Sequence, residues 1–442
     1  MYVRRVVLEN VRCFERLDFK FGPRGDRYPG WTVITGDNAA GKTTLLKAIA
    51  LALVGPDAAR TLVPSMRGWV REGCEEATIA VEIVAGDEDR FRRAGARYKE
   101  PFWSELRLSN GNGPEVTLGQ GARYRRKGKG PAKGPWADNP EGWFSAGYGP
   151  FRRLYGASPN AQRVMSGPGR VARYATMFLE DATLGECELW LTDLSHKRLE
   201  HRQKETEILD RVLLLLNDDF LRNGVRVDRV DSEGLWLRDM AGVTLRLADM
   251  SEGYRAALAM LVDVLRQMIA VYGHQAFTES VDGHLSVRYP GVVLVDEVDS
   301  HLHPEWQRVI GFWLKERFPK VQFIVSTHSP IICQAADQDG IFHLPTPGTD
   351  VKPFQIKGEE YQRIIRSKPD AIYVSPAFGL EHTRSPLAVR KREEYAGLRA
   401  KQHAGRLSGS EGQEIRQLRL WIDPAEDEKE DEDACAGSSE GR

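Results

Sequence analysis

The sequence has few cysteines, no long apolar run and almost no net charge, and each shortage excludes a class of protein. The cysteines are scattered, odd in number and without metal-ligand spacing, which argues against both a disulfide framework and a cysteine metal site. They are Cys13, Cys74, Cys187, Cys333 and Cys435. No apolar run approaches the roughly twenty residues of a membrane-spanning helix. Residues 1–5 lead into a strand-like run without a signal-peptide core. We therefore expect a cytoplasmic protein with no membrane partner.

Positive charge is balanced over the whole chain but concentrated in one stretch. The 62 Lys and Arg residues face 63 Asp and Glu residues, so bulk charge does not make the chain a polyanion binder. Residues 86–136, however, hold twelve Lys or Arg and six acids. The centre of this stretch is glycine-rich and should form a loop, with basic residues that include Arg123, Arg125, Arg126, Lys127 and Lys129. Such a loop either contacts the phosphate backbone of DNA or RNA or is a solvated surface, and the sequence leaves both open.

The most informative stretch lies near the N-terminus. A β-branched run ends at Gly36, the pattern G-x-x-x-x-G-K-T follows, and an apolar helix comes next. Strand, glycine-rich loop and helix are the context of a phosphate-binding loop, in which backbone N–H groups and the helix N-terminus face nucleotide phosphates. Lys42 would reach the β and γ phosphates, and the Thr43 hydroxyl would bind Mg²⁺. The expected nucleotide contacts are Gly36, Asn38, Ala39, Ala40, Gly41, Lys42, Thr43 and Thr44.

Two further strand ends carry groups that suit hydrolysis of a nucleotide. Residues 292–295 are continuously apolar, as in a strand buried on both faces of a parallel sheet. Asp296 and Glu297 follow at the carboxyl end, where such sheets bind ligands. We predict that Asp296 holds Mg²⁺ and that Glu297 polarises the attacking water. His328 follows a second buried run and is placed to donate a hydrogen bond to the γ phosphate and sense its loss.

A third motif begins another apolar helix. Ser251, Glu252 and Gly253 precede the run AALAMLVDVLRQM, and a small polar residue with a glycine at a helix start is suited to an anion. The alternative is that Ser251 is simply the N-cap of this helix.

In this order, the phosphate loop and the segments M-S-E-G-Y (250–254), V-V-L-V-D-E (292–297) and V-S-T-H-S-P (325–330) resemble the ABC-type ATPase heads of the SMC, RecF and OLD group. Residues 299–307 and 147–152 are similar to one bacterial branch, the AAA-family defence ATPases of the Septu type such as PtuA. The resemblance covers roughly residues 1–335. It implies an α/β fold in which a mixed or parallel sheet is flanked by helices, with a helical insertion. The residues that follow this head predict a C-terminal helical hairpin.

The same resemblance implies residue roles and partners. Ser251, Glu252 and Gly253 would contact the γ phosphate held by a second head, and Asp299 would lie in the loop that crosses this interface. Arg12 and Phe14 would approach the adenine, while Gln120 and Gln162 are the two candidates for the glutamine of related heads. ATP and Mg²⁺ are therefore the expected cofactors of a homodimer or higher homo-oligomer. Its ATP hydrolysis would control a separately encoded nuclease, HNH-type by resemblance, in anti-phage defence.

We expect five parts in the chain. They are an N-terminal head lobe (1–85), an insertion with the basic loop and a helical arm (86–224), a C-terminal head lobe (225–350), a helical extension (351–425) and an acidic disordered tail (426–442). The extension lacks clustered acids on strands, so no nuclease is expected in this chain. Its hairpin, residues 387–402 and 410–421, either packs on the head or docks a partner.

Two other functions remain open from the sequence. One is a RecF-like clamp that acts in DNA repair and loads other proteins. The other is a transporter ATPase, against which the poor glutamine-loop match and the H-L-H-P segment at 301–304 argue. The signature segment departs from the transporter pattern, with Glu252 and Tyr254 where transporters have Gly and Gln.

Overall fold

The computed structural model describes residues 1–22, 27–91, 100–110, 116–120, 130–274, 277–279 and 284–422. The basic residues predicted to contact nucleic acid, Arg123, Arg125, Arg126, Lys127 and Lys129, lie outside these ranges, as does the acidic tail. Contacts divide the chain into two units, Met1–Phe378 and Gly379–Arg442.

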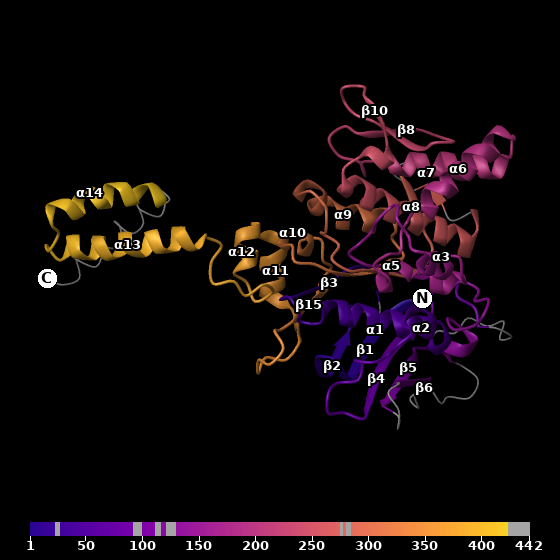
Figure 1. The fold of residues 1–442 in the computed structure, drawn as a ribbon, viewed down its shortest axis with the longest axis horizontal. Helices are drawn as coiled ribbons and strands as arrows, with labels where there is room; N and C mark the ends of the chain where they lie inside the picture. The colour runs from indigo at the N-terminus through magenta and orange to yellow at the C-terminus, as the bar shows by residue number, and fades with distance from the viewer. Residues whose placement is uncertain are drawn as a thin grey trace. The chain divides into compact units, whose positions relative to one another are not determined.

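The first unit is built around a six-stranded sheet in the order β16-β15-β3-β14-β13-β7. Two of its strands, β15 and β3, are labelled in Figure 1. Neighbouring strands from β15 to β7 are parallel, and β16 is antiparallel to β15. Val293 and Val295 of β13 face one hydrophobic core, and Val292 and Leu294 face the other. This two-sided burial explains the continuous apolar run and confirms the predicted α/β fold with a mixed, mainly parallel sheet. The strands are β3 Gly30–Gly36, β7 Ser145–Tyr148, β13 Gly291–Val295, β14 Val321–Ser326, β15 Ile341–Leu344 and β16 Phe354–Ile356.

A second, antiparallel sheet has the order β2-β1-β4-β5-β6. Helix α1 (Lys42–Val54) packs between the two sheets, touching β4 and β5 on one side and β13 and β14 on the other. Eleven of its thirteen residues are buried, so the helix is apolar around most of its circumference, as its position between two layers requires. The strands are β1 Tyr2–Val11, β2 Phe14–Lys20, β4 Glu76–Val84, β5 Phe102–Asn110 and β6 Val116–Gln120.

Helices α6 (Glu186–Leu199) and α7 (Gln203–Leu216) lie in the part of the insertion range where a helical arm was predicted. The chain turns between them at His201, which has φ +59°. The polar residues of this span gather at the turn and are largely exposed, while Leu191, Leu209 and Val212 enter the main core. The insertion range also contributes β5 and β6 to one sheet and β7 to the other.

The remaining elements of the first unit complete the two layers. Three antiparallel strands form the sheet β10-β9-β8, and a two-stranded sheet pairs β11 with β12. The strands are β8 Arg226–Asp231, β9 Gly234–Arg238, β10 Thr244–Arg246, β11 Phe277–Glu279 and β12 Leu285–Val287. The helices are α2 Pro56–Leu62, α3 Pro159–Met165, α4 Gly169–Ala172, α5 Ala175–Phe178, α8 Glu252–Tyr272, α9 Pro304–Arg317, α10 Pro330–Cys333, α11 Gly358–Arg366 and α12 Pro369–Tyr373.

The second unit contains the predicted helical hairpin, α13 (Pro386–His403) and α14 (Gly409–Leu418). A small cluster of Tyr395, Leu398, Leu418 and Ile422 holds the helices together. At the start of α14, Ser408 and Glu411 form a capping box, which fixes where the helix begins. Within the described ranges, no helix has the length and apolar character needed to cross a membrane.

Candidate nucleotide-binding site

A cavity of about 290 Å³ lies beside the residues that follow β3, β13 and β14. Because these strands are parallel neighbours, their carboxyl ends meet at one edge of the sheet, where ligands bind in open α/β folds. Three motifs that are far apart in the sequence therefore line one space. The lining residues are Arg12, Cys13, Asn38, Ala39, Gly41, Lys42, Thr43, Thr44, Glu297 and His328.

The phosphate loop has the conformation that its glycines allow. Gly41 has φ +96°, and a Cβ there would lie 2.6 Å from both the Cys13 Sγ and the Phe14 ring. The Lys42 Nζ donates to the carbonyl oxygens of Gly36 at 2.8 Å and Asp37 at 2.9 Å, so the ammonium is held within the loop. Burial lowers the pKa of Lys42, and the nearby carboxylates, Asp296 first among them, oppose this shift. The loop thus presents one buried cation at a tight glycine turn, as a phosphate site requires.

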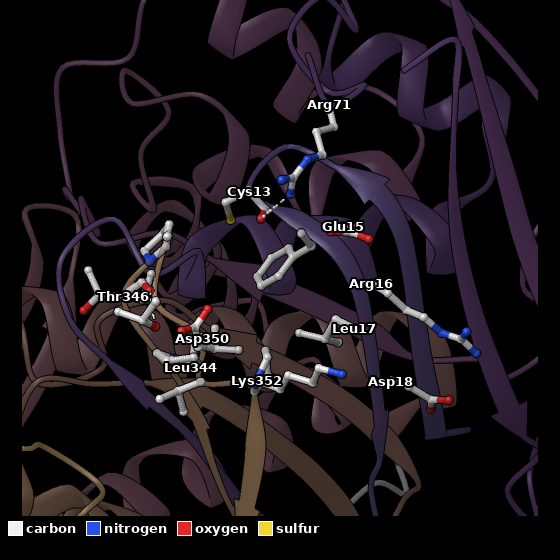
Figure 2. A pocket seen from close by; sticks show the side chains of 18 residues that line it. Cys13, Glu15, Arg16, Leu17, Asp18, Arg71, Leu344, Thr346, Asp350 and Lys352 are labelled. Carbon is white, nitrogen blue, oxygen red and sulfur yellow. Dashed lines mark hydrogen bonds between the residues drawn. The ribbon is translucent and has the colours of Figure 1, made fainter. Parts of the chain in front are cut away.

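Two predicted contacts, Phe14 and Ala40, face a neighbouring cavity of about 650 Å³. Figure 2 shows this cavity between residues of β2 and the segment 344–353. Cys13 lines both cavities, so the two adjoin at the bend between β1 and β2. The Thr346 Oγ1 donates to the Asp37 Oδ2 at 2.6 Å, which ties the segment 344–353 to the phosphate loop.

Arg12 lies at the rim of the smaller cavity in a left-handed conformation, with φ +49°. Its guanidinium stacks on the Trp69 ring at 4.2 Å and donates to the Thr44 Oγ1 at 3.4 Å. Burial lowers the pKa of Arg12. The aromatic ring therefore fixes a cation next to the phosphate loop, an arrangement known as a cation–π contact.

Asp296 ends β13 and is 1% exposed. Its Oδ1 accepts a hydrogen bond of 2.5 Å from the Ser326 Oγ, while its Oδ2 is buried without a hydrogen-bond partner among the described residues. An unpaired buried carboxylate oxygen is costly unless a ligand completes it, and it fits Mg²⁺. The described chain groups no three His, Cys, Asp or Glu side chains into a metal cage. One carboxylate with the Thr43 hydroxyl suits Mg²⁺, which takes its other ligands from water and phosphates.

Glu297 has a left-handed backbone, φ +45°, which costs of the order of 1 kcal/mol or more and needs support from its surroundings. Its N–H donates to the Ser326 Oγ at 2.8 Å, and the Ser300 Oγ donates to its Oε2 at 3.1 Å. The side chain lines the cavity together with His328. The unusual turn therefore directs a carboxylate toward the phosphate loop and holds it there.

The third predicted motif does not line this cavity. Ser251 is exposed at the N-cap position of α8, and its side chain makes no capping hydrogen bond. Glu252 and His301 approach to 3.5 Å, and Asp299 accepts a 2.5 Å hydrogen bond from the Thr327 Oγ1. The motif and the loop 299–302 thus lie together on the same chain, and neither lines the cavity.

Gly253 is held at close range by this loop, because a Cβ there would lie 2.4 Å from the His301 carbonyl oxygen. We predict that Gly253→Ala destabilises the protein by about 1–3 kcal/mol, since the loop or the helix must shift. The measurement is the urea midpoint of the first unfolding transition. Gly169→Ala is the matched control, because its added Cβ would meet the tip of the flexible Arg173 side chain at 3.3 Å. A midpoint unchanged from wild type in Gly253→Ala would contradict the close approach.

Several residues of the site have no counterpart among the predicted contacts. They are Cys13, Trp69, Arg152, Ser326 and Thr327. Ser326 and Thr327 stand inside the V-S-T-H-S-P segment and Arg152 ends the segment 147–152, whereas Cys13 and Trp69 lack a local signal. Gln162 is exposed on α3, and Gln120 ends β6 in the antiparallel sheet. Gln162 does not line the cavity.

Comparisons with known proteins match the two halves of this site separately. Residues 5–126, which contain the phosphate loop, match a family described as "AAA domain". Residues 183–334, which contain Ser251, Glu297 and His328, match a family described as "AAA domain, putative AbiEii toxin, Type IV TA system".

Three curated relatives align with parts of the chain. Septu protein PtuA of Bacillus mycoides (strain KBAB4) is 23% identical over 75% of this chain and 38% of its own length. A retron Ec83 probable ATPase of Escherichia coli is 33% identical over 27% of this chain and 21% of its own length. The DNA replication and repair protein RecF of Stenotrophomonas maltophilia (strain R551-3) is 35% identical over 23% of this chain and 27% of its own length. The chain thus spans well under half the length of each of these relatives. Together with the two AAA-domain matches, these alignments identify the chain as an AAA-type ATPase of the SMC, RecF and Rad50 group, with Septu PtuA and retron ATPases as distant relatives.

Proposed function

We propose that the protein binds and hydrolyses ATP between two copies of its head. The observation that carries this proposal is the separation of the site into two parts. Lys42, Glu297 and His328 line one cavity, whereas Ser251 is exposed outside it at the uncapped start of α8. The free N-terminus of a long helix attracts anions, and a second copy could present it to the γ phosphate.

In this proposal each residue of the cavity has one task. Lys42 and the loop amides bind the β and γ phosphates, and Arg12 and Phe14 lie on the side where the adenosine enters. Thr43 and Asp296 would hold Mg²⁺, which when bound neutralises charge on the phosphates. Glu297 accepts a proton from the attacking water, whose oxygen bonds to the γ phosphorus as the bond to ADP breaks. His328 donates a hydrogen bond to the γ phosphate, and Asp299 lies at the interface between copies.

The test of this function measures both the rate of ATP hydrolysis and the molecular mass of the protein in solution. Wild-type protein should release phosphate from Mg-ATP, and light scattering after gel filtration should give a dimer with a non-hydrolysable ATP analogue and a smaller species with ADP. Chelation of Mg²⁺ should stop turnover. A protein with no phosphate release, or with one mass under both conditions, would refute the two-copy ATPase.

We further propose that ATP-dependent closure controls a separately encoded nuclease in anti-phage defence. The relationship to Septu PtuA and to retron ATPases supports this role, and the helical hairpin of the second unit is a candidate docking element. The head changes state because the γ phosphate joins two surfaces only while it is present. Co-expression with its genomic neighbours should yield a complex with a nuclease, HNH-type by resemblance. Purification without any such partner would count against the role.

A repair function of the RecF kind is the second candidate, and the 35% identity to RecF over 111 residues favours it. The two candidates predict different partners and different responses to DNA. A repair ATPase should hydrolyse ATP faster with DNA and lack a nuclease partner, whereas the defence ATPase should copurify with the nuclease.

The basic loop offers a direct test of nucleic-acid binding. We predict that neutralising Arg125, Arg126 and Lys127 together weakens DNA or RNA binding and flattens its salt dependence, since each lost phosphate contact lowers the slope of log K against log salt by roughly 0.9. Affinity measured by fluorescence anisotropy at several salt concentrations gives this slope. Neutralising Lys20, Arg60 and Lys320, which are outside the basic stretch of the sequence, is the control. If wild type binds no nucleic acid at low salt, the loop is solvated surface.

A further inference from the structure

We propose that Arg152 is a positioning residue for ATP hydrolysis, which holds the turn that carries Asp296 and Glu297. This inference rests on the ATPase function proposed above. It concerns a residue of the segment 147–152, whose pattern G-Y-G-P-F-R had no role in the predicted chemistry.

The guanidinium of Arg152 is bound to four backbone carbonyl oxygens. Nη1 donates to Gly149 at 3.0 Å and Asp296 at 2.9 Å, while Nη2 donates to Glu297 at 3.1 Å and Ser300 at 3.2 Å. Three of these carbonyls belong to the turn that follows β13. One side chain therefore spans the whole turn, from the predicted Mg²⁺ ligand to the serine that steadies Glu297.

The side chain is buried as a cation. Arg152 is 4% exposed, and no carboxylate of the described residues lies within ion-pair distance of it. Burial lowers its pKa to about 10, opposed by Asp299, Asp296 and Glu297, so the group is charged at neutral pH. Burying a charge is costly unless hydrogen bonds compensate, and the four carbonyls do so. The cation also offsets repulsion among the three carboxylates of this turn.

The turn needs such support. Glu297 has φ +45°, a conformation that persists only where the surroundings fix it. The carbonyl oxygens of Asp296 and Glu297 lie beyond the last paired residue of β13 and so have no ladder partner on that strand. The Glu297 carbonyl also accepts from the Ser300 N–H at 2.9 Å, and the Glu297 N–H is held by Ser326. Without the guanidinium the Asp296 carbonyl would lose this donor, and the turn would be held less firmly relative to the phosphate loop.

Arg152 is itself anchored by the strand it follows. The chain leaves β7, the parallel neighbour of β13, and the Asp296 N–H donates to the Tyr148 carbonyl at 2.8 Å. The Tyr148 hydroxyl in turn donates to Asp263 of α8 at 2.9 Å, in the core. Gly149 packs so closely that a Cβ would lie 2.3 Å from the Thr176 carbonyl oxygen. The segment 147–152 thus joins the hydrolytic turn to the helix that begins at Glu252.

The geometry distinguishes arginine from lysine. Nη1 and Nη2 each serve a different pair of carbonyls, and a single ammonium cannot reach both pairs at once. Arg152→Met should lower kcat by about 100-fold, because small displacements of a reacting group cost about that much. ATP affinity should stay close to wild type, since Lys42 and the loop amides are untouched. Arg152→Lys should retain part of the lost kcat.

The experiment measures kcat, KM and the affinity for a non-hydrolysable ATP analogue in wild type, Arg152→Met, Arg152→Lys and Arg153→Met. Arg153 is the matched control, an exposed arginine next in sequence that does not contact the turn. A fifth variant, Arg152→Ala, is assayed with and without guanidinium ions at sub-denaturing concentration, with tetramethylammonium at equal ionic strength as the reference. Guanidinium should restore turnover to this variant and not to Glu297→Gln.

The outcomes separate this inference from the proposed function. No phosphate release by wild type refutes the ATPase itself. Wild-type turnover with unchanged kcat in both Arg152→Met and Arg152→Lys overturns the positioning role. If Arg152→Met fails to fold, Arg152→Lys decides: lower kcat at unchanged nucleotide affinity supports the proposal. The positioning role is overturned if Arg152→Lys also fails to fold, or if its nucleotide affinity falls in proportion to its kcat. Either result would make Arg152 a residue that supports the fold in general.

Discussion

Lys42→Ala should bind ATP at least about 100-fold more weakly than wild type. Hydrogen bonds to charged groups contribute about 1.5–3 kcal/mol each, and the loss of one or two of them to the phosphates corresponds to this change in affinity. The Nζ is held between the carbonyls of Gly36 and Asp37 at 2.8 and 2.9 Å. It therefore needs little rearrangement to meet a phosphate, and no other lysine lines the described cavity.

Isothermal titration with a non-hydrolysable ATP analogue and Mg²⁺ measures the effect. Lys20→Ala, an exposed lysine at the end of β2, controls for the loss of one positive charge. Circular dichroism should show that Lys42→Ala keeps its fold, because the side chain bonds only to loop carbonyls that water or Mg²⁺-bound nucleotide can also approach. Wild-type affinity in Lys42→Ala would mean that the cavity is not the phosphate site.

The strands and loops around this cavity were predictable because their signals are local. The apolar runs of β3, β13 and β14 indicated strands buried on both faces, and the sheet places them side by side. The glycine at position 41 indicated a tight loop, and its φ of +96° is a conformation that L side chains rarely adopt. In each case neighbouring residues contain both the pattern and its physical cause.

The contacts that hold the catalytic turn were not predictable in the same way. Arg152 donates to the Asp296 carbonyl although the two residues are 144 positions apart in the sequence. Trp69, which stacks on Arg12, lies in the connection between α2 and β4. An arginine after a short strand gives no hint that four carbonyls will surround it. Gly253 shows the same limit, since the sequence indicated an anion-binding glycine and the structure adds a steric reason, the His301 carbonyl 2.4 Å from its absent Cβ.

Replacement of the predicted general base tests the chemistry and the assembly together. Glu297→Gln should lower turnover by about 1,000-fold, within the range for loss of a general base. The amide keeps the size of the side chain and can still accept the Ser300 hydrogen bond, now 3.1 Å to Oε2. ATP should therefore remain bound, and the ATP-dependent dimer should accumulate. Glu305→Gln, an exposed acid at the start of α9, is the control. Unchanged turnover in Glu297→Gln would refute the general-base assignment.

The trapped dimer then allows a separate test of the proposed contact between Ser251 of one copy and the γ phosphate bound by the other. Ser251 is exposed and outside the cavity of its own chain. Adding Ser251→Arg to Glu297→Gln should therefore abolish the dimer, because a large side chain blocks the start of α8, while each monomer still binds ATP through Lys42. Light scattering measures the first effect and titration the second. If the double variant loses ATP affinity as a monomer, Ser251 belongs to the same-chain site; if it still dimerises with ATP, the start of α8 is not the surface that meets the second nucleotide.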